Sequence, residues 1–367
     1  MIIATIIFLA VVVLPDIILF RKYIKARSSQ LWNLLWWLPT ILLALAVIGG
    51  IAGFWHSFFM RAIYALVFLA VIPKLLFTLF FKLTGVKVAA GIAALSVLGA
   101  LYGFVFGFNR LTVREEVFES VGVPASFDGY RIVQLSDLHL GTYPASGKML
   151  KKVASKVAEL KPDLIVFTGD LVNVSPEEIE PFAQILSSLS APDGVLSVLG
   201  NHDYGFRREE TAAQALEMTA AEQALGWEVL NNGNAVIRRG ADSLFVAGVE
   251  NTSKGFFISR GDLPAALSGI PGGAFIILLT HDPKHWEQEV LSAEPRVALT
   301  LSGHTHAMQF KLGRISPAAL MFHQWSGKYL SEDGEQMLNV SEGIGGIVPI
   351  RLGSWPELCV ITLKTKI

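Results

Sequence analysis

The chain has 367 residues, of which 52% are hydrophobic and only 17% are charged. This composition excludes a disordered chain and is too apolar for an ordinary soluble domain. The charge is uneven, because residues 1–110 carry nine Lys or Arg and one acid, a formal charge of +8, whereas the remainder carries −9. Such an asymmetry indicates a membrane part joined to a soluble part. The single cysteine, Cys359, excludes an internal disulfide.

Four apolar stretches come first in the chain: residues 2–20, 31–53, 62–80 and 88–108. Each approaches the ~20 residues with which a helix crosses a hydrocarbon layer of ~30 Å. They predict an anchor of four transmembrane helices over residues 1–110. Asp16 and Lys74 are interpreted as lying near the ends of their stretches, which disfavours a channel or a transporter.

The short loops between these stretches differ in their content of Lys and Arg. The first loop, RKYIKARSSQ, has four bases, the second, WHSFFMRA, has one, and the third, FKLTGVK, has two. Basic loops favour the cytoplasmic side of a membrane, so the first and third loops are expected there. Both termini and the soluble part are then expected outside the cytoplasm.

After residue 110, short apolar runs alternate with segments of helical spacing. An edge strand is expected to begin within residues 109–128. Further strands are predicted at residues 130–136, 163–169, 194–200, 243–249, 274–280, 296–301, 336–341 and 357–365. Helices are predicted at residues 147–160, 175–189, with Ser175 as N-cap, and 209–225. This alternation favours a layered α/β domain over residues 111–367.

Residues of metal-ligand type follow five of the predicted strands. They are Asp137 and His139, then Asp170, then Asn201, His202 and Asp203, then His281 and Asp282, and finally His304 and His306. Ligands bind at the carboxyl ends of the strands in α/β sheets, so these side chains are expected to gather there. A carboxylate such as that of Asp170 can bridge two metal ions ~3.5–4 Å apart. Nitrogen and oxygen donors without thiolate suit Mn, Zn, Fe or Ni and do not choose among them.

The ordered motifs DLH, GD, GNHD, H and GHTH resemble the pattern of the calcineurin-like metallophosphoesterases over about residues 129–365. The ending GIGGIVPIRLGSWPEL is similar to a bacterial membrane-associated branch of that family. The resemblance implies a four-layer α/β/β/α sandwich and two divalent metal ions. It also implies hydrolysis of a phosphate ester by in-line attack of a hydroxide that bridges the metals.

The same resemblance implies a role for individual residues. The first metal ion would be held by Asp137, His139, Asp170 and His306. The second metal ion would be held by Asp170, Asn201, His281 and His304. His202 would contact the phosphate and protonate the leaving oxygen or stabilise its charge, and Asp203 would orient His202.

Four further residues are open to two interpretations. Tyr204 and Arg207 follow the GNHD motif and are candidates for contact with the substrate, with solvated loop positions as the alternative. Arg351 is a candidate for either a substrate phosphate contact or a structural ion pair. Asp282 is interpreted as a turn residue or a supporting residue rather than a metal ligand.

The sequence therefore predicts a membrane-anchored, two-metal phosphoesterase that acts outside the cytoplasm. Its substrate is expected to be a phosphate ester or pyrophosphate, carried by a small molecule, a lipid or a component of the envelope. Two alternatives stay open: a cytoplasm-facing hydrolase of a nucleotide-sugar lipid precursor, and a non-catalytic membrane sensor with a degenerate phosphoesterase domain. The acidic soluble part lacks the basic footprint of a nucleic-acid-binding surface, so membrane lipid but no nucleic acid is expected as a partner.

Overall fold

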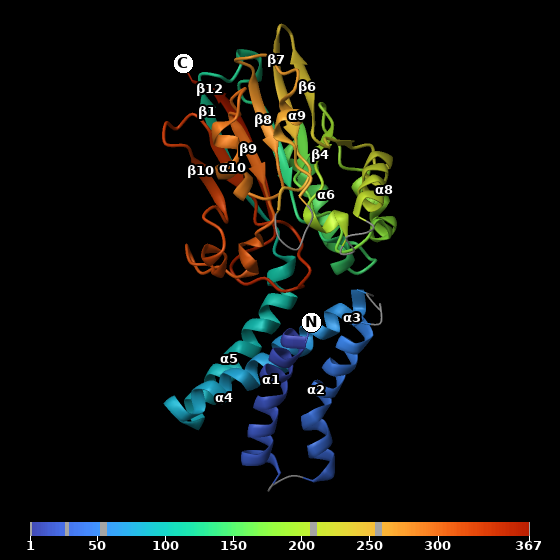
Figure 1. The fold of residues 1–367 in the computed structure, drawn as a ribbon, viewed down its shortest axis with the longest axis vertical. Coiled ribbons are helices and arrows are strands. Elements are labelled where there is room, and N and C mark those ends of the chain that lie inside the picture. Colours follow the sequence, from blue (N-terminus) through green and yellow to red (C-terminus); the bar gives the residue numbers. More distant parts are fainter. Residues whose placement is uncertain (1, 26–28, 52–56, 206–210, 254–258, 367) are drawn as a thin grey trace. The chain divides into compact units, whose positions relative to one another are not determined.

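The chain forms two compact units, each described by itself. The computed structural model describes residues 2–25, 29–51, 57–205, 211–253 and 259–366. A helical unit comprises residues 1–106 with 348–350, and an α/β unit comprises residues 107–347 with 351–367 (Figure 1).

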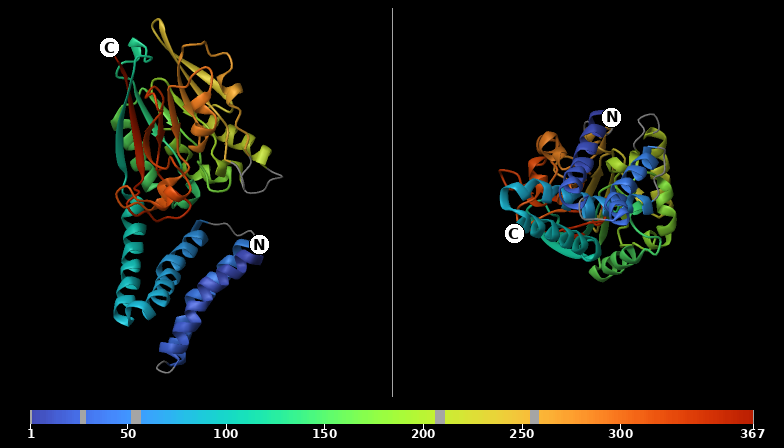
Figure 2. Two further views of the ribbon diagram at one scale, coloured as in Figure 1. Left: turned by 60° about the vertical axis from the view of Figure 1, so that its left-hand side comes forward. Right: turned by 90° about the horizontal axis from the view of Figure 1, so that it is seen from below.

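The helical unit consists of α1 (Ile2–Leu19), α2 (Gln30–Ile51), α3 (Ser57–Leu66), α4 (Ile72–Thr84) and α5 (Val86–Val105). Short π-helical turns follow α1 and join α3 to α4, at Phe20–Ile24 and Val67–Val71. Helices α4 and α5 form a hairpin (Figure 2) that turns at Gly85, where φ is 83°. Glycine adopts this left-handed backbone without the steric cost that a side chain would bring.

Three stretches are long and apolar enough to cross a membrane: Gln30–Gly49, Phe59–Thr84 and Val86–Asn109. They correspond to the second, third and fourth expected spans. The first expected span, residues 2–20, is helical in α1, but the side chains of residues 2–9 lie outside the described part. Within the described residues the four expected spans are therefore reduced to three, and the first stays a prediction.

Asp16 and Lys74 meet inside the helical unit, a contact that the sequence analysis did not predict. Lys74 Nζ lies 2.6 Å from Asp16 Oδ1, and the hydroxyl of Thr40 donates a hydrogen bond to the other carboxylate oxygen. Lys74 Nζ also lies 4.4 Å from the centre of the Trp36 ring. Asp16 is only 1% exposed, so these partners offset the cost of removing its carboxylate from solvent.

The α/β unit is built on two mixed six-stranded sheets. The order of the first sheet is β1 (Thr112–Ser120), β12 (Glu357–Thr365), β2 (Arg131–Leu135), β3 (Leu164–Phe167), β4 (Val195–Ser197) and β5 (Glu228–Val229). The order of the second is β10 (Gly327–Leu330), β11 (Met337–Val340), β9 (Leu299–Ser302), β8 (Phe275–Leu279), β7 (Asp242–Gly248) and β6 (Gly233–Arg239). Strands β2 to β5 are parallel, as are β7, β8, β9 and β11. The expected α/β domain is confirmed.

An apolar core lies between the two sheets, because alternate residues of each central strand point inward. Val166 of β3 and Ile277 of β8 belong to this core and are fully buried. The intervening residues of β2 and β3 pack with helix α6 (Lys148–Leu160). Those of β8 and β11 pack with the short helices α9 (Leu263–Leu267) and α10 (Lys284–Gln288). Both sheets are thus covered on their outer faces, which leaves the strand ends as the place for a site.

Some local elements differ from the prediction. The helix expected from Ser175 is a 3₁₀ segment, Pro176–Phe182, followed by one α-helical turn, α7 (Ala183–Leu186). Pro181 lies inside this segment and has no N–H to donate, which disfavours a continuous α-helix. Helix α8 (Thr211–Ala224) agrees with the third predicted helix. The edge strands β6 and β10 were not predicted, because half-buried edge strands carry little apolar alternation.

Candidate metal centre

The residues expected at the five strand ends lie in the loops that follow those strands. Asp137 and His139 follow β2, Asp170 follows β3, Asn201 and His202 follow β4, His281 follows β8, and His304 and His306 follow β9. Three of these strands belong to the first sheet and two to the second. The candidate site is therefore built jointly by both sheets.

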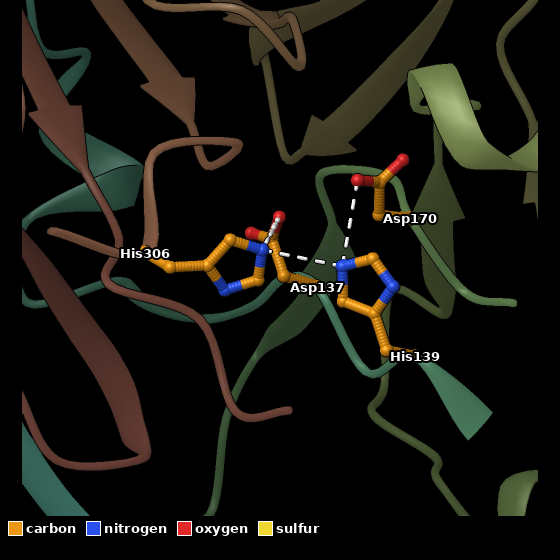
Figure 3. A group of neighbouring side chains, drawn as sticks. All are labelled: Asp137, His139, Asp170 and His306. Atoms are coloured by element: carbon orange, nitrogen blue, oxygen red, sulfur yellow. Dashed lines mark hydrogen bonds and ion pairs between the residues drawn. The ribbon is translucent and has the colours of Figure 1, made fainter. Parts of the chain in front are cut away.

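Four of these side chains form a first group (Figure 3), namely Asp137, His139, Asp170 and His306. One donor atom from each lies within 4.8 Å of the others. His139 Nε2 is 3.2 Å from His306 Nε2 and 3.6 Å from Asp170 Oδ2. His306 Nε2 is 3.3 Å from Asp137 Oδ1. These four are the residues expected around the first metal ion.

A second group shares Asp170 with the first and adds His281 and His304. His281 Nε2 is 3.2 Å from Asp170 Oδ2 and 3.2 Å from His304 Nδ1. The buried Oδ1 of Asn201 has no hydrogen-bond partner among the residues that the structure describes. The backbone N–H of His202, the next residue, donates to Asp170 Oδ1 at 2.8 Å, which ties the Asn201 loop to the shared carboxylate.

The donor atoms of both groups fit metal ions. In each histidine pair two ring nitrogens face one another at 3.2 Å, and their lone pairs repel unless a cation or a proton lies between them. A buried amide oxygen without a partner costs free energy, which a metal ion would offset. The set of imidazoles, carboxylates and one amide suits divalent transition-metal ions.

Hydrogen bonds behind the donor atoms set the orientation of the histidine rings. His281 Nδ1 donates to the carbonyl of Thr168 at 2.7 Å, so its Nε2 faces Asp170. His139 Nδ1 lies 3.1 Å from the side-chain oxygen of Asn173, and His202 Nδ1 lies 2.9 Å from the backbone carbonyl of the same residue. Such supporting partners fix the tautomer of a ligand histidine. Asn173 was missed in the sequence, where its only signal is an amide three residues after Asp170.

Asp203 does not have the contact expected of it. Its carboxylate accepts four backbone N–H groups, those of Gly200, Asp170, Leu171 and Val172, at 2.8 to 3.2 Å. The expected orientation of His202 by Asp203 is thus wrong, because the described partner of His202 Nδ1 is the carbonyl of Asn173. Asp203 instead holds together the loops that follow β3 and β4.

The backbone is left-handed at five non-glycine residues of the site. Asp137, His139, Asp170, His304 and His306 have φ values between 50° and 71°. Side chains rarely adopt this conformation, and where they do the strain is commonly found at functional sites. The glycine of the GHTH motif is also required, since a Cβ on that residue would lie 1.9 Å from the hydroxyl of Ser136. These loops therefore adopt an unfavourable backbone conformation, and that conformation brings the donor atoms of the site together.

Burial and neighbouring charge set the protonation of the site. Burial lowers the pKa of His139 to about 3 and that of His304 to about 4, which keeps both rings in the neutral form that binds metal. Burial acts in the same direction on His281, but the charge of Asp170 outweighs it and raises the pKa of His281 to about 10. Burial would raise the pKa of Asp170, yet the nearby His281 and His202 hold it well below its usual range. Asp170 is thus the anionic centre of the site.

Two of the candidate substrate contacts have partners inside the domain. The hydroxyl of Tyr204 is buried and donates to Glu250 Oε1 at 3.0 Å. Arg351 is fully buried, and its guanidinium donates to the carbonyls of Glu342, Gly345 and Ser354 and to the Ser354 hydroxyl. One of its nitrogens also lies 3.3 Å from His306 Nδ1. Both residues support loops from inside the domain.

The remaining candidates have simpler outcomes. Arg207 lies outside the described residues. Asp282 accepts hydrogen bonds from the backbone N–H of Lys284 and the hydroxyl of Ser253, as expected of a turn residue.

The chain is similar to known proteins along the part that holds this site. Residues 130–308 match the family model of the calcineurin-like phosphoesterases. The chain is 32% identical over 266 residues to an uncharacterized metallophosphoesterase of Bacillus subtilis, YkuE, and this match covers 70% of the chain and 87% of that protein. The chain belongs to the calcineurin-like metallophosphoesterases. This family uses a dinuclear metal site, and as a member the protein is a metal-dependent phosphoester hydrolase.

Two further metallophosphoesterases show the range of the similarity. A zebrafish (Danio rerio) transmembrane protein with a metallophosphoesterase domain is 32% identical over 273 residues, which cover 72% of the chain and 60% of that protein. The UDP-2,3-diacylglucosamine pyrophosphatase LpxG of Chlamydia trachomatis is 28% identical over 294 residues, which cover 65% of the chain and 84% of that enzyme. With its three apolar helices, the present metallophosphoesterase is a membrane protein.

Proposed function

We propose that this metallophosphoesterase is anchored by residues 1–110 and hydrolyses a lipid-linked phosphate ester or pyrophosphate with its domain at residues 111–367, a four-layer α/β/β/α sandwich. The observation that carries the proposal is that Asp170 belongs to both groups of donor atoms. The apolar helices of the same chain support the membrane anchor. The similarity to a pyrophosphatase whose named substrate carries two acyl groups supports a lipid-linked pyrophosphate.

Two divalent metal ions would occupy the site, with Asp170 shared between them. The first would be held also by Asp137, His139 and His306, and the second also by Asn201, His281 and His304. When bound, these ions would lower the pKa of a water molecule and neutralise charge on the phosphoryl oxygens, as an in-line displacement requires.

His202 is proposed as the proton donor to the leaving oxygen. Its ring lies edge-on to that of His139, with the ring centres 4.9 Å apart, so it borders the first group of donor atoms. Because the Asn173 carbonyl can only accept, Nδ1 carries a proton, and Nε2 is the nitrogen that would exchange a proton with the substrate. Asp203 would act as a positioning residue through the backbone of Asp170.

The turn between α4 and α5 supports one side of the membrane for the catalytic domain, whatever the number of spans before it. Lys82 and Lys87 flank this turn, and basic loops favour the cytoplasm. The catalytic domain, which follows α5, would then be outside the cytoplasm. The alternative is a cytoplasm-facing hydrolase of a nucleotide-sugar lipid precursor, for which the similarity to LpxG speaks. An alkaline phosphatase reporter fused after residue 367 would be active only in the first case.

The enzymatic proposal is tested with the full chain reconstituted in vesicles with added Mn²⁺. We expect the wild type to cleave a lipid-linked pyrophosphate in the vesicles and, more slowly, a soluble chromogenic phosphodiester. Asp170→Asn and His202→Ala should abolish both activities, while Leu216→Ala on the exposed face of α8 should keep them. Unchanged activity in both site variants would contradict the mechanism, whereas a wild type that cleaves neither substrate would favour a non-catalytic sensor. Equal cleavage of soluble substrate without the helices would contradict the lipid-linked substrate.

A further inference from the structure

The loop that follows His306 exposes a cluster of apolar side chains. Eleven large apolar residues are exposed in the described part of the α/β unit, and six of them lie within residues 308–321, here called the apolar loop. They are Met308, Phe310, Leu312, Ile315, Leu320 and Met321. Leu320 is 90% exposed, and Leu312 and Ile315 are 72% exposed. The surfaces of soluble proteins rarely concentrate apolar residues in this way unless a membrane or a partner molecule covers them.

Hydrogen bonds hold the apolar loop in a defined form. Leu312 and Ile315 pair through both of their backbone groups, at 2.9 and 3.1 Å. The hydroxyl of Ser316 donates to the carbonyl of Ala307 at 2.7 Å and accepts from the backbone N–H of Ala318. The apolar side chains are therefore displayed by an ordered backbone.

The apolar loop is bonded to the segment of residues 351–355. The backbone N–H of Lys311 donates to the carbonyl of Leu352 at 2.8 Å, and the N–H of Leu352 donates to the carbonyl of Gln309 at 2.9 Å. A Cβ on Gly353 would lie 1.7 Å from the carbonyl of Lys311, so the two segments are in direct contact. The position of the apolar loop is thus tied to that of residues 351–355.

The same segment contacts the residues at which the last apolar span, Val86–Asn109, ends. A Cβ on Gly107 would lie 2.0 Å from the carbonyl of Arg351, so only glycine fits there. The guanidinium of Arg110 lies 4.9 Å from the centre of the Trp355 ring. A Trp and an Arg at the end of an apolar span are typical of the interface between hydrocarbon and water.

Charge in the apolar loop also fits a lipid surface. Lys311 and Arg314 alternate with the exposed apolar residues, and the acidic side chain that pairs with Lys311 is the buried Glu342. Segments that enter a bilayer surface combine apolar side chains with Lys and Arg, which contact the lipid phosphates. A protein partner is less well matched, because the loop adjoins the residues that end a membrane span.

We propose that the apolar loop is a membrane-binding surface whose side chains enter the bilayer that α5 crosses. Since only Ala307 separates His306 from this loop, the metal centre would lie close to lipid headgroups. The inference rests on the proposed function only in taking Val86–Asn109 as a membrane span. A lipid-linked substrate could then reach the site without leaving the membrane surface.

The full chain, reconstituted in vesicles of phosphatidylethanolamine and phosphatidylglycerol, tests this directly. The native Cys359 is buried, and burial raises the pKa of its thiol to about 12, so it resists labelling. A single cysteine introduced as Leu320→Cys or Leu312→Cys would carry a polarity-sensitive fluorophore. Leu216→Cys on α8, where the leucine is 73% exposed, is the matched control.

We expect emission from positions 320 and 312 to shift to the blue and to be quenched by lipids that carry nitroxides on their acyl chains. Emission from position 216 should show neither effect. Emission at 320 and 312 that equals that at 216 would overturn the proposal. A blue shift without quenching by the lipids would also overturn it, because a second copy of the chain would then cover the loop. The fluorescence readout uses no substrate. An active enzyme whose labels at positions 320 and 312 are not quenched would therefore refute the membrane-binding loop but not the proposed function.

Discussion

The carboxylate of Asp203 accepts a hydrogen bond from the backbone N–H of Asp170 at 2.9 Å. The same carboxylate binds the N–H of Gly200 at 2.8 Å, so it joins the two loops that carry the shared ligand and Asn201. A buried carboxylate that accepts several N–H groups can define a backbone conformation that neither loop would hold alone. The acid of the GNHD motif therefore acts on the metal centre through the main chain.

Asp203→Asn should weaken this arrangement without changing the proton donor. Each carboxylate oxygen of Asp203 accepts two backbone N–H groups. In the asparagine variant an NH₂ group replaces one of these oxygens, so two backbone N–H donors would lose their acceptor. We expect a loss of about 1–3 kcal/mol in the free energy of unfolding. The metal affinity should also fall, while the pH profile of kcat keeps its shape.

The matched control is Asp262→Asn at the exposed N-cap of α9, where the carboxylate accepts the N–H of Ala265. It should leave metal affinity unchanged. A displaced pH profile in Asp203→Asn would instead support a direct action of Asp203 on His202.

Asn173→Ala should weaken the first metal position. The variant removes the side-chain oxygen that contacts His139 Nδ1 but keeps the backbone carbonyl that contacts His202. Loss of such a supporting hydrogen bond typically lowers metal affinity about 10–100-fold. A Mn²⁺ titration followed by calorimetry measures this, with Asn231→Ala, whose amide contacts only Thr219 of α8 among the described side chains, as the comparison. Equal affinities in the two variants would refute the role of Asn173.

Glu222→Gln should stabilise the protein above neutral pH. Glu222 is fully buried in α8 beside the hydroxyl of Ser197, and burial holds its pKa well above the usual range. An acid whose pKa is raised on folding stabilises the folded state at low pH, and this contribution is lost as pH rises through the folded pKa. Each pKa unit corresponds to about 1.4 kcal/mol.

The gain in melting temperature of Glu222→Gln over the wild type should therefore be larger at pH 8 than at pH 5. Glu217→Gln in the same helix should show no such trend. A gain independent of pH would contradict a protonated Glu222.

Asp16 and Lys74 should be coupled in the stability of the helical unit. Asp16→Leu leaves the lysine without its carboxylate, and Lys74→Leu leaves a buried charge, so each should cost about 3–5 kcal/mol. The double variant should recover most of that loss, because it removes both charges. Thermal unfolding in detergent provides the double-mutant cycle, and additive losses would show that the pair does not interact.

Much of the candidate site was visible in the sequence because parallel strands end at one edge of a sheet. Each of the five apolar strands is followed within a few residues by Asp, His or Asn, and the structure brings these together around Asp170. The partners of Asp203 were not predictable, because they are backbone groups whose positions depend on left-handed residues such as Asp170. The role of Arg351 stayed open between a phosphate contact and a structural ion pair because sequence alone does not reveal complete burial.

In the helical unit, the apolar stretches predicted the helices but not their contacts. Asp16 and Lys74 are 58 residues apart and were each interpreted alone. Only the packing of α1 against α4 shows that they form a pair. The general lesson is that periodicity and motifs locate elements and donor atoms, whereas supporting hydrogen bonds depend on tertiary structure.

The most direct test of the account is the number of metal ions that the full chain holds. Mass spectrometry of protein loaded with Mn²⁺ and desalted should give two ions per chain for the wild type and one for His304→Ala. Asp170→Asn should hold neither, because Asp170 belongs to both groups of donor atoms. His323→Ala, at a histidine whose side chain is 85% exposed, should match the wild type. Two ions retained in Asp170→Asn would contradict a shared carboxylate at the centre of the site.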